Sequence, residues 1–261
     1  KKMSNSSLNL KIIPNIPDID KGDNISGILI SALEKSSIIL MEYDVLCIAH
    51  KIFSKAEGCI IKLTEITPSK EAIELGKTLN KDARKVEVVL QESKKIIRSF
   101  KRADQNEGTL ICQHKLGFIC ANAGVDESNL AENETVITVP KNPDHSMKVL
   151  RDQLRNYFNL ENLGIVMSDT FGRPWRIGQV NAAIGIAGLP ATKKEQGTRD
   201  AWGNQLYVTE PAFCDEIAAS SGLLMSKAGK CPAILLRGLS WSGEYGSASH
   251  ILREQKEDMF R

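Results

Sequence analysis

Apolar residues occur along this chain in two patterns that alternate from one end to the other. Short apolar or alternating runs bounded by Gly, Pro or polar residues are typical of strands. They predict strands at 8–16, 44–48, 59–63, 136–139, 164–167 and 233–236, a hairpin of 110–112 with 118–121 around Gly117, and a strand or tight turn at 180–187. The run at 44–48 is apolar enough to be buried on both faces of a sheet.

Other segments place apolar residues at helical spacing behind capping residues or proline. They predict a helix after Asp23 or Asn24, one from 67–69 to about Asn80, one over 83–97, one from Pro143 through Phe158, and one over 211–225. Hairpins mixed with strand-helix alternation predict an α+β fold with mixed and antiparallel sheets and flanking helices, not a doubly wound parallel sheet. We expect one domain over 8–245, with room for two subdomains, and a charged tail or helix over 246–261.

Composition excludes several classes of protein. The chain has 261 residues, 42% hydrophobic and 25% charged, with a formal net charge of +2. A balanced charge and only 5% aromatic residues argue against a nucleic-acid partner. No apolar run approaches 18 residues, and the start of the chain does not look like a secretory signal. We therefore expect a cytoplasmic protein with no membrane partner.

Cysteine and histidine spacing does not favour a zinc site. The six cysteines include no C-x-x-C pair, and most lie inside apolar runs. The four histidines form no H-E-x-x-H or similar cluster. Buried, reduced thiols are the expected state of the cysteines.

Polar residues interrupt the apolar pattern where strands end, and loops on a rigid scaffold are where binding groups concentrate. The segments are 15–18, 50–55, 122–129, 168–170 and 226–230. In the stretch ANAGVDESN, Asp126 and Asn129 are three residues apart and can face one side of a helical turn. A carboxylate and an amide oxygen suit a hard cation. The alternative is an Asp N-cap with Asn129 merely exposed, and taken alone that alternative is favoured.

The stretch SDTFGRPWR places Asp169 and Thr170 directly after a strand. Carboxylate and hydroxyl oxygens suit Mg²⁺ or Mn²⁺, which bind through few protein ligands plus substrate phosphates; the alternative is a turn or cap. Arg173 and Arg176 follow, and guanidinium groups hold phosphate or carboxylate oxygens. Trp175 between them is either a stacking surface or a packing residue.

Two basic segments could contact phosphates. Lys51 and Lys55 follow His50 after a buried strand, where lysines can act as point charges toward phosphate. The stretch MSKAGK, from Met225, contains a Gly turn but lacks the Walker A spacing. Its simple interpretation is a helix C-terminus with Gly229 as cap.

Four motifs in order along the chain carry a resemblance. IFSKAEG, CANAGVDESN, SDTFGRPWRIGQVNAAIGIAG and PAILLRG are similar to the coenzyme F-420-0:L-glutamate ligase family over about residues 10–245. The resemblance implies an unusual α+β fold in an intertwined homodimer. It implies a reaction in which GTP drives attachment of L-glutamate to the lactyl carboxylate of F-420-0, followed by γ-linked additions, with Mg²⁺ or Mn²⁺ and often K⁺.

The resemblance also implies roles for individual residues. It makes Asp126, Asp169 and Thr170 metal ligands, and it assigns the GTP site to Asn129, His50, Lys51, Lys55, the turn Asn15, Ile16, Pro17, Asp18 and the loop Met225, Ser226, Lys227, Ala228, Gly229. Three positions depart from the family pattern. Asn15 replaces a common Gly, His50 and Lys51 stand where some members have small hydroxylated residues, and Lys227 replaces an acidic ligand of some members.

These residues fit phosphoryl transfer onto a carboxylate, which depends on positioning and charge neutralisation. Arg173 and Arg176 are candidates to bind the acceptor's phosphate or the carboxylates of glutamate. Two other functions remain open. A metal-dependent phosphohydrolase would cleave GTP regardless of glutamate, and a non-catalytic nucleotide or cofactor sensor would bind without turnover. Clustered acids favour catalysis over sensing.

Overall fold

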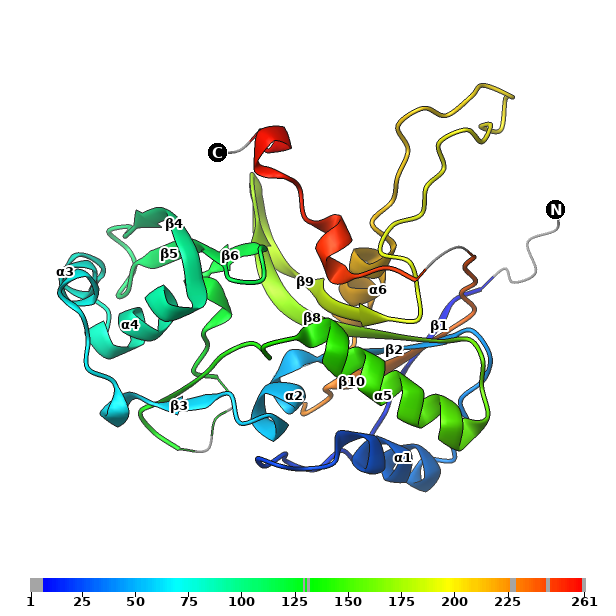
Figure 1. The fold of residues 1–261 in the computed structure, drawn as a ribbon, viewed down its shortest axis with the longest axis horizontal. Helices are drawn as coiled ribbons and strands as arrows, with labels where there is room; N and C mark the ends of the chain where they lie inside the picture. The colour runs from blue at the N-terminus through cyan, green and yellow to red at the C-terminus, as the bar shows by residue number, and fades with distance from the viewer. Residues whose placement is uncertain (1–6, 129, 131, 226–228, 243–244, 260–261) are drawn as a thin grey trace.

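The computed structural model describes residues 7–128, 130, 132–225, 229–242 and 245–259 (Figure 1). Its largest sheet has five strands in the order β1-β10-β2-β8-β9. The strands are β1 Asn9–Ile12, β2 Asp44–Ala49, β8 Leu163–Arg173, β9 Arg176–Ala187 and β10 Ala233–Arg237. The pair β2–β8 is parallel and the other neighbours are antiparallel, so the sheet is mixed.

Helices cover both faces of this sheet. Helices α1 (Ile25–Lys35) and α5 (Pro143–Phe158) lie on one face and α6 (Phe213–Ser221) on the other (Figure 1). Alternate residues of each central strand therefore enter different cores. In β2, Leu46 packs with the α1–α5 core and Val45 with the α6 core. Burial on both faces explains why these strands are continuous apolar runs.

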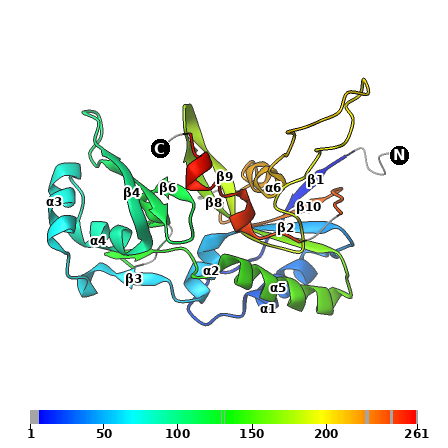
Figure 2. The ribbon, with the colours of Figure 1, turned by 45° about the horizontal axis from the view of Figure 1, so that its top comes forward.

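The remaining elements form a second lobe beside the sheet (Figure 2). It contains β3 (Ile60–Lys62) paired with β7 (Thr135–Ile137), the antiparallel sheet β4 (Ser93–Phe100), β5 (Thr109–His114), β6 (Ile119–Ala121), and helices α3 (Lys70–Leu79) and α4 (Ala83–Glu92). Short helix α2 (His50–Ala56) connects the sheet to this lobe along the chain, and the 3-10 turns Leu63–Glu65 and Asn122–Gly124 follow β3 and β6. A separate core fills this lobe.

The α+β class and the mixed and antiparallel sheets are confirmed, as are several local signals. Asn24 caps α1 by accepting from the Gly27 amide, and Ser69 caps α3 by accepting from Ala72. Helix α3 ends at Leu79, and its C-cap Asn80 has a left-handed φ of 53°. The expected hairpin around Gly117 is present.

Other expected boundaries were wrong. The helix expected over 83–97 ends at Glu92, and Ser93–Phe100 is strand β4. Ser93 donates to the Val89 carbonyl at 2.6 Å, and β-branched Ile96 then pairs with Cys112. The first strand is confined to Asn9–Ile12, and the helix expected over 211–225 to Phe213–Ser221. The described residues after 245 include two 3-10 turns, Ala248–Ile251 and Gln255–Glu257, and no α-helix.

Within the described ranges, no helix is both long and apolar enough to cross a membrane. The six cysteines are free, and four of them are buried. Burial raises the pKa of the Cys47 thiol to about 11 and that of Cys214 to about 12. These thiols are packing groups, as the apolar context of the cysteines predicts.

One ion pair ties the central strands together, and it generates a testable prediction. Asp44 is fully buried and accepts from Arg237 Nε at 2.8 Å and Nη2 at 2.7 Å. We expect Arg237→Met to lower the free energy of unfolding by about 2–3 kcal/mol, because a buried carboxylate loses its partner while Arg237 itself is part-exposed. Urea unfolding measures the change, with exposed Lys148→Met, which breaks the pair with Asp152, as control. Equal stability of both variants would contradict this role.

Candidate active site

The parallel pairing of β2 with β8 ends at a single step, and the candidate functional side chains follow that step on both strands. The register runs from Asp44 opposite Leu163 to Ala49 opposite Ser168. Beyond Ala49 the chain turns directly into α2, so His50 and Lys51 are its first residues. Beyond Ser168, β8 loses its parallel partner but continues, paired only with β9.

Asp169 and Thr170 therefore lie within a strand and not in a loop, which corrects the expectation that the strand stops at Met167. They sit at the base of a hairpin of β8 and β9 that extends beyond the sheet (Figure 1). A register shift at Met167/Ser168 marks the point where the hairpin leaves the sheet. Such bulges re-aim side chains next to functional sites.

The third contribution comes from the second lobe, through a tight turn after β6. Asn122, Ala123 and Gly124 all have positive φ, between 50° and 72°. Left-handed geometry at Ala123 is unfavourable, so this turn stores backbone strain. A Cβ on Gly124 would lie 2.8 Å from Val139 Cγ2 and 3.8 Å from Asp169 Oδ2. The glycine thus lets the turn approach Asp169 and deliver Asp126 to the same place.

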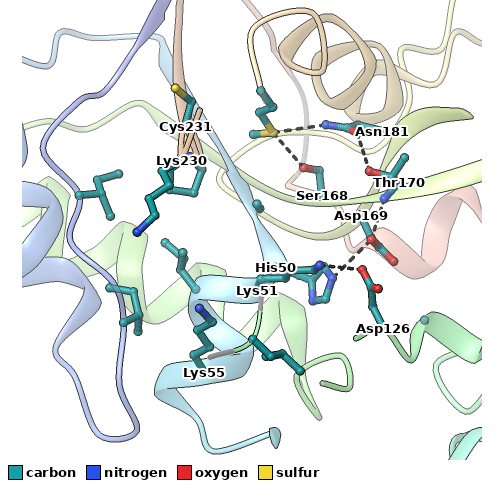
Figure 3. A pocket seen from close by; sticks show the side chains of 18 of the residues that line it. His50, Lys51, Lys55, Asp126, Ser168, Asp169, Thr170, Asn181, Lys230 and Cys231 are labelled. Atoms are coloured by element: carbon teal, nitrogen blue, oxygen red, sulfur yellow. Dashed lines mark hydrogen bonds and ion pairs between the residues drawn. The ribbon is translucent and has the colours of Figure 1, made fainter. Parts of the chain in front are cut away.

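These three segments line a cavity of about 640 Å³ (Figure 3). Its wall comprises Ile16, Pro17, Asp18, Ile19, Asp20, Ala49, His50, Lys51, Ile52, Lys55, Ala121, Asn122, Gly124, Val125, Asp126, Leu130, Ser168, Asp169, Thr170, Gln179, Asn181, Met225, Lys230, Cys231 and Pro232. Most of the residues predicted to bind nucleotide or metal are among them, although they come from distant parts of the sequence.

Asp126 is held in a dense set of hydrogen bonds. Lys51 Nζ lies 2.6 Å from Asp126 Oδ2, and the Glu127 and Ser128 amides donate to Oδ1 at 2.7 and 3.0 Å. Burial raises the pKa of this carboxyl, but hydrogen bonds from Lys51 and Ser128 outweigh burial and hold the pKa well below its usual value. Asp126 is therefore a carboxylate at neutral pH, as a metal ligand must be.

Asp169 faces the same cavity, with a different partner. Its Oδ1 lies 3.4 Å from Nε2 of the buried His50, whose Nδ1 lies 3.0 Å from Ser54 Oγ. Thr170 is exposed, and its hydroxyl donates to Asn181 Oδ1 at 3.0 Å. Figure 3 shows Asp126 and Asp169 lying close to each other beside His50 and Lys51.

Positive charge at the cavity comes from three lysines. Lys51 is paired with Asp126, and Lys230 lies 2.9 Å from Asp18. Lys55 lines the cavity, and its side chain forms no hydrogen bond or ion pair within the described ranges. Sequence reasoning did not select Lys230, although it ends the MSKAGK stretch.

Some predicted residues lie elsewhere. Asn15 faces a neighbouring hollow and donates to Ser36 Oγ at 3.2 Å. Arg173 and Arg176 flank the exposed tip of the β8–β9 hairpin and do not line the cavity. Met225 does line it, whereas Gly229 is described but not in the wall. Asn129, Ser226, Lys227 and Ala228 lie outside the described residues.

Sequence reasoning missed the polar residues of β9. Gln179 and Asn181 line the cavity opposite the β8 residues, and Cys231 lies at its β10 side. The signal for Gln179 and Asn181 was their spacing of two, which places both on one face of a strand. That signal could not be used because the sequence did not decide whether 180–187 forms a strand or a tight turn.

The donor set fits a hard divalent cation. No cluster of three or more His, Cys, Asp or Glu suited to a metal occurs in the described part of the chain. Two carboxylates and a hydroxyl leave positions for waters and phosphate oxygens, which is how Mg²⁺ is usually bound. Acids for a cation beside lysines for phosphate are the composition of a site that handles nucleotide phosphates.

Comparison with known proteins shows the family of this chain. Residues 14–238 match the family described as F420-0:Gamma-glutamyl ligase. The chain is 37% identical over 252 residues to the Coenzyme F420:L-glutamate ligase of Methanothermobacter thermautotrophicus, covering 95% of this chain and 97% of that protein. It is 37% identical over 260 residues to the protein of the same name from Methanopyrus kandleri, covering 98% of each. The chain belongs to the F420-0:gamma-glutamyl ligase family.

The strained turn below Asp126 gives a prediction about stability. We expect Gly124→Ala to lower the free energy of unfolding by about 1–3 kcal/mol, from a left-handed φ of 72° and the contact with Val139. Gly22→Ala is the matched control, because Gly22 has a φ of 91° but no atom within 4 Å of its added Cβ. Thermal unfolding of both variants checks the difference. If Gly22→Ala lowers the free energy of unfolding as much as Gly124→Ala does, the close approach of the turn to Val139 is unimportant for stability.

Proposed function

We propose that this chain is a ligase that uses GTP and a divalent metal to join L-glutamate to coenzyme F-420-0, first at the lactyl carboxylate and then through γ-linkages. One observation carries the proposal. Asp126 from the second lobe and Asp169 with Thr170 from the central sheet line one cavity together with Lys51 and Lys55. The family of the chain suggests the substrates, and the acids and lysines of the cavity suit the proposed phosphoryl transfer.

The reaction needs activation because a carboxylate is a poor electrophile. An oxygen of the F-420-0 carboxylate attacks the γ-phosphorus of GTP, the bond to the β-phosphate oxygen breaks, and GDP leaves. The glutamate amine then attacks the carbonyl carbon of the acyl phosphate, inorganic phosphate leaves, and a proton is lost from nitrogen. Phosphoryl transfer of this kind depends on positioning and charge neutralisation.

Asp126, Asp169 and Thr170 are the proposed ligands of Mg²⁺ or Mn²⁺, with K⁺ as an accessory ion. When bound, the metal neutralises charge on the phosphate oxygens. Lys51 already provides a cation at Asp126, 2.6 Å away. Binding of metal and phosphate would transfer Lys51 from that carboxylate toward a phosphate oxygen.

The nucleotide would occupy the side of the cavity formed by the 15–18 turn and the start of α2. Lys55 forms no ion pair within the described ranges and is the proposed phosphate contact, with His50 and Lys51 beside it. The loop from Met225 to Gly229 and Asn129 complete the proposed GTP site.

Arg173 and Arg176 are proposed to bind the acceptor's phosphate or the carboxylates of glutamate. Their position at the hairpin tip requires a substrate that extends outward along the hairpin. The tip also exposes Ile177 completely. The exposed aromatic residues Trp202 and Tyr207 lie on a separate projection, the arm over 192–211 (Figure 1). Exposed apolar residues on these two projections support the proposed intertwined homodimer.

Two other functions use the same residues. A metal-dependent phosphohydrolase would release GDP without glutamate, and a sensor would bind GTP without turnover. GDP release measured with F-420-0, with and without L-glutamate, together with the mass of the product, separates all three. The proposal requires an F-420-0 product heavier by one or more glutamyl residues. GDP release of equal rate without glutamate and without such a product would support hydrolysis instead.

Removal of one proposed metal ligand tests the scheme. We expect Asp169→Asn to reduce metal-dependent GTP turnover roughly 100-fold or more, because a neutral amide binds a divalent cation poorly and its charge is lost beside the phosphates. Initial rates of GDP release at varied Mg²⁺ measure the effect. Asp152→Asn on the exposed face of α5 is the control, and it should retain wild-type turnover. Near-normal turnover of Asp169→Asn would contradict the scheme.

The proposed homodimer has its own test. We expect sedimentation velocity to show one species of twice the chain mass. Ile177→Lys should shift that species toward the monomer, since a charge on an apolar contact surface is costly to bury. Lys148→Glu, a charge change on α5 far from the hairpin tip in sequence, serves as control. A monomeric wild-type chain at micromolar concentration would contradict the dimer.

A further inference from the structure

The β8–β9 hairpin presents a row of residues that continues the cavity wall outward. Thr170 is opposite Asn181, and Gly172 is opposite Gln179. Residues two apart on a strand share a face, so these four form one surface. Thr170, Gln179 and Asn181 line the cavity, and a Cβ on Gly172 would meet no atom within 4 Å. The row is thus an open floor beginning at a proposed metal ligand.

The two amides on this floor differ in their engagement. Asn181 accepts from Thr170 Oγ1 at 3.0 Å and donates to Met225 Sδ at 3.3 Å. The Gln179 side chain forms no hydrogen bond within the described part of the chain, although it lines the cavity. Asn181 therefore orients the Thr170 hydroxyl, while Gln179 offers a free carboxamide to a ligand.

The in-line geometry of phosphoryl transfer indicates which substrate lies over this floor. The attacking and leaving oxygens are roughly in line with phosphorus, so the acceptor approaches from the side opposite to the departing diphosphate. Figure 3 shows Lys55 and Lys230 on one side of the cavity and Thr170 with Asn181 on the other, with Asp169 beside Thr170. If the nucleotide lies toward the lysines, the hairpin floor is where the acceptor enters.

We propose that Gln179 binds the carboxylate of the phosphoryl acceptor, F-420-0, with Gly172 keeping space for the rest of that substrate beside it. The inference rests on the proposed function and names the subsite of its carboxylate substrate. A carboxamide N–H can donate to a carboxylate oxygen without carrying charge. It can position the nucleophilic oxygen without the strong ion pair that an Arg or Lys would form there.

Three variants test this subsite. Gln179→Ala removes the donor, Gln179→Glu keeps the shape but places a negative charge beside a carboxylate, and Gly172→Val fills the open floor. We expect the KM for F-420-0 to rise roughly 10-fold or more in Gln179→Ala, as for loss of a hydrogen bond to a charged group, and further in Gln179→Glu. The KM for GTP and the Mg²⁺ dependence should stay within about twofold, because the floor lies beyond the proposed ligands.

Calorimetric titration of F-420-0 and, separately, of GDP with Mg²⁺ gives a readout independent of turnover. Gln91→Ala, at an exposed position of α4, is the matched control and should leave both affinities unchanged. Unchanged F-420-0 affinity in Gln179→Ala and Gln179→Glu would overturn the inference. An equal loss of GDP affinity would also overturn it, by placing Gln179 at the nucleotide. A wild-type chain that forms no glutamylated product would instead overturn the proposed function, and the inference with it.

Discussion

The parallel register of β2 and β8 is the constraint on which the site depends. Ala49 is paired with Ser168, and both strands leave their shared ladder at that step. Strand β2 is followed by α2, and β8 continues into the hairpin. His50 Nε2 and Asp169 Oδ1 therefore lie 3.4 Å apart. A slip of one residue would send the side chains of β8 to opposite faces and exchange its two cores. The apolar packing on both faces of the sheet thereby fixes where the polar groups lie.

The second lobe is joined to this arrangement by charge and by aromatic packing. Lys51 of α2 bonds Asp126 beyond β6, and Phe171 on the hairpin packs against Phe118, with ring centroids 5.3 Å apart. Phe118 in turn stacks on the buried His114 at 4.6 Å. Because these contacts span the lobes next to the two acids, the distance between the acids depends on how the lobes pack.

The sequence predicts some of this structure and not the rest, for identifiable reasons. Continuous apolar runs such as 44–48 are distinctive because both faces are buried, and Asn24, Ser69 and Pro143 carry local start signals for helices. Strand β4 was missed because Ile97 continues the helical spacing of Val89 and Ser93, and only pairing with β5 selects the extended form. The candidate residues could be chosen from motifs. Their convergence, and the inclusion of Gln179 and Asn181, depend on long-range pairing that no local pattern encodes.

Local chemistry and the proposed reaction agree at one turn and at two lysines. Asn15 has a φ of 65°, and Asn is among the residues that best tolerate this left-handed conformation. Asn15 therefore permits the turn that leads to Ile16, Pro17 and Asp18 at the cavity. The lysines Lys51 and Lys230 are each already paired with a carboxylate at 2.6 and 2.9 Å. If metal and triphosphate bind as proposed, the Asp126 carboxylate would contact the metal ion in place of the Lys51 ammonium. The Lys51 ammonium would then contact a phosphate in place of Asp126. Such an exchange conserves ion pairs among groups that are already ordered, so binding need not leave a buried charge without a partner at any stage.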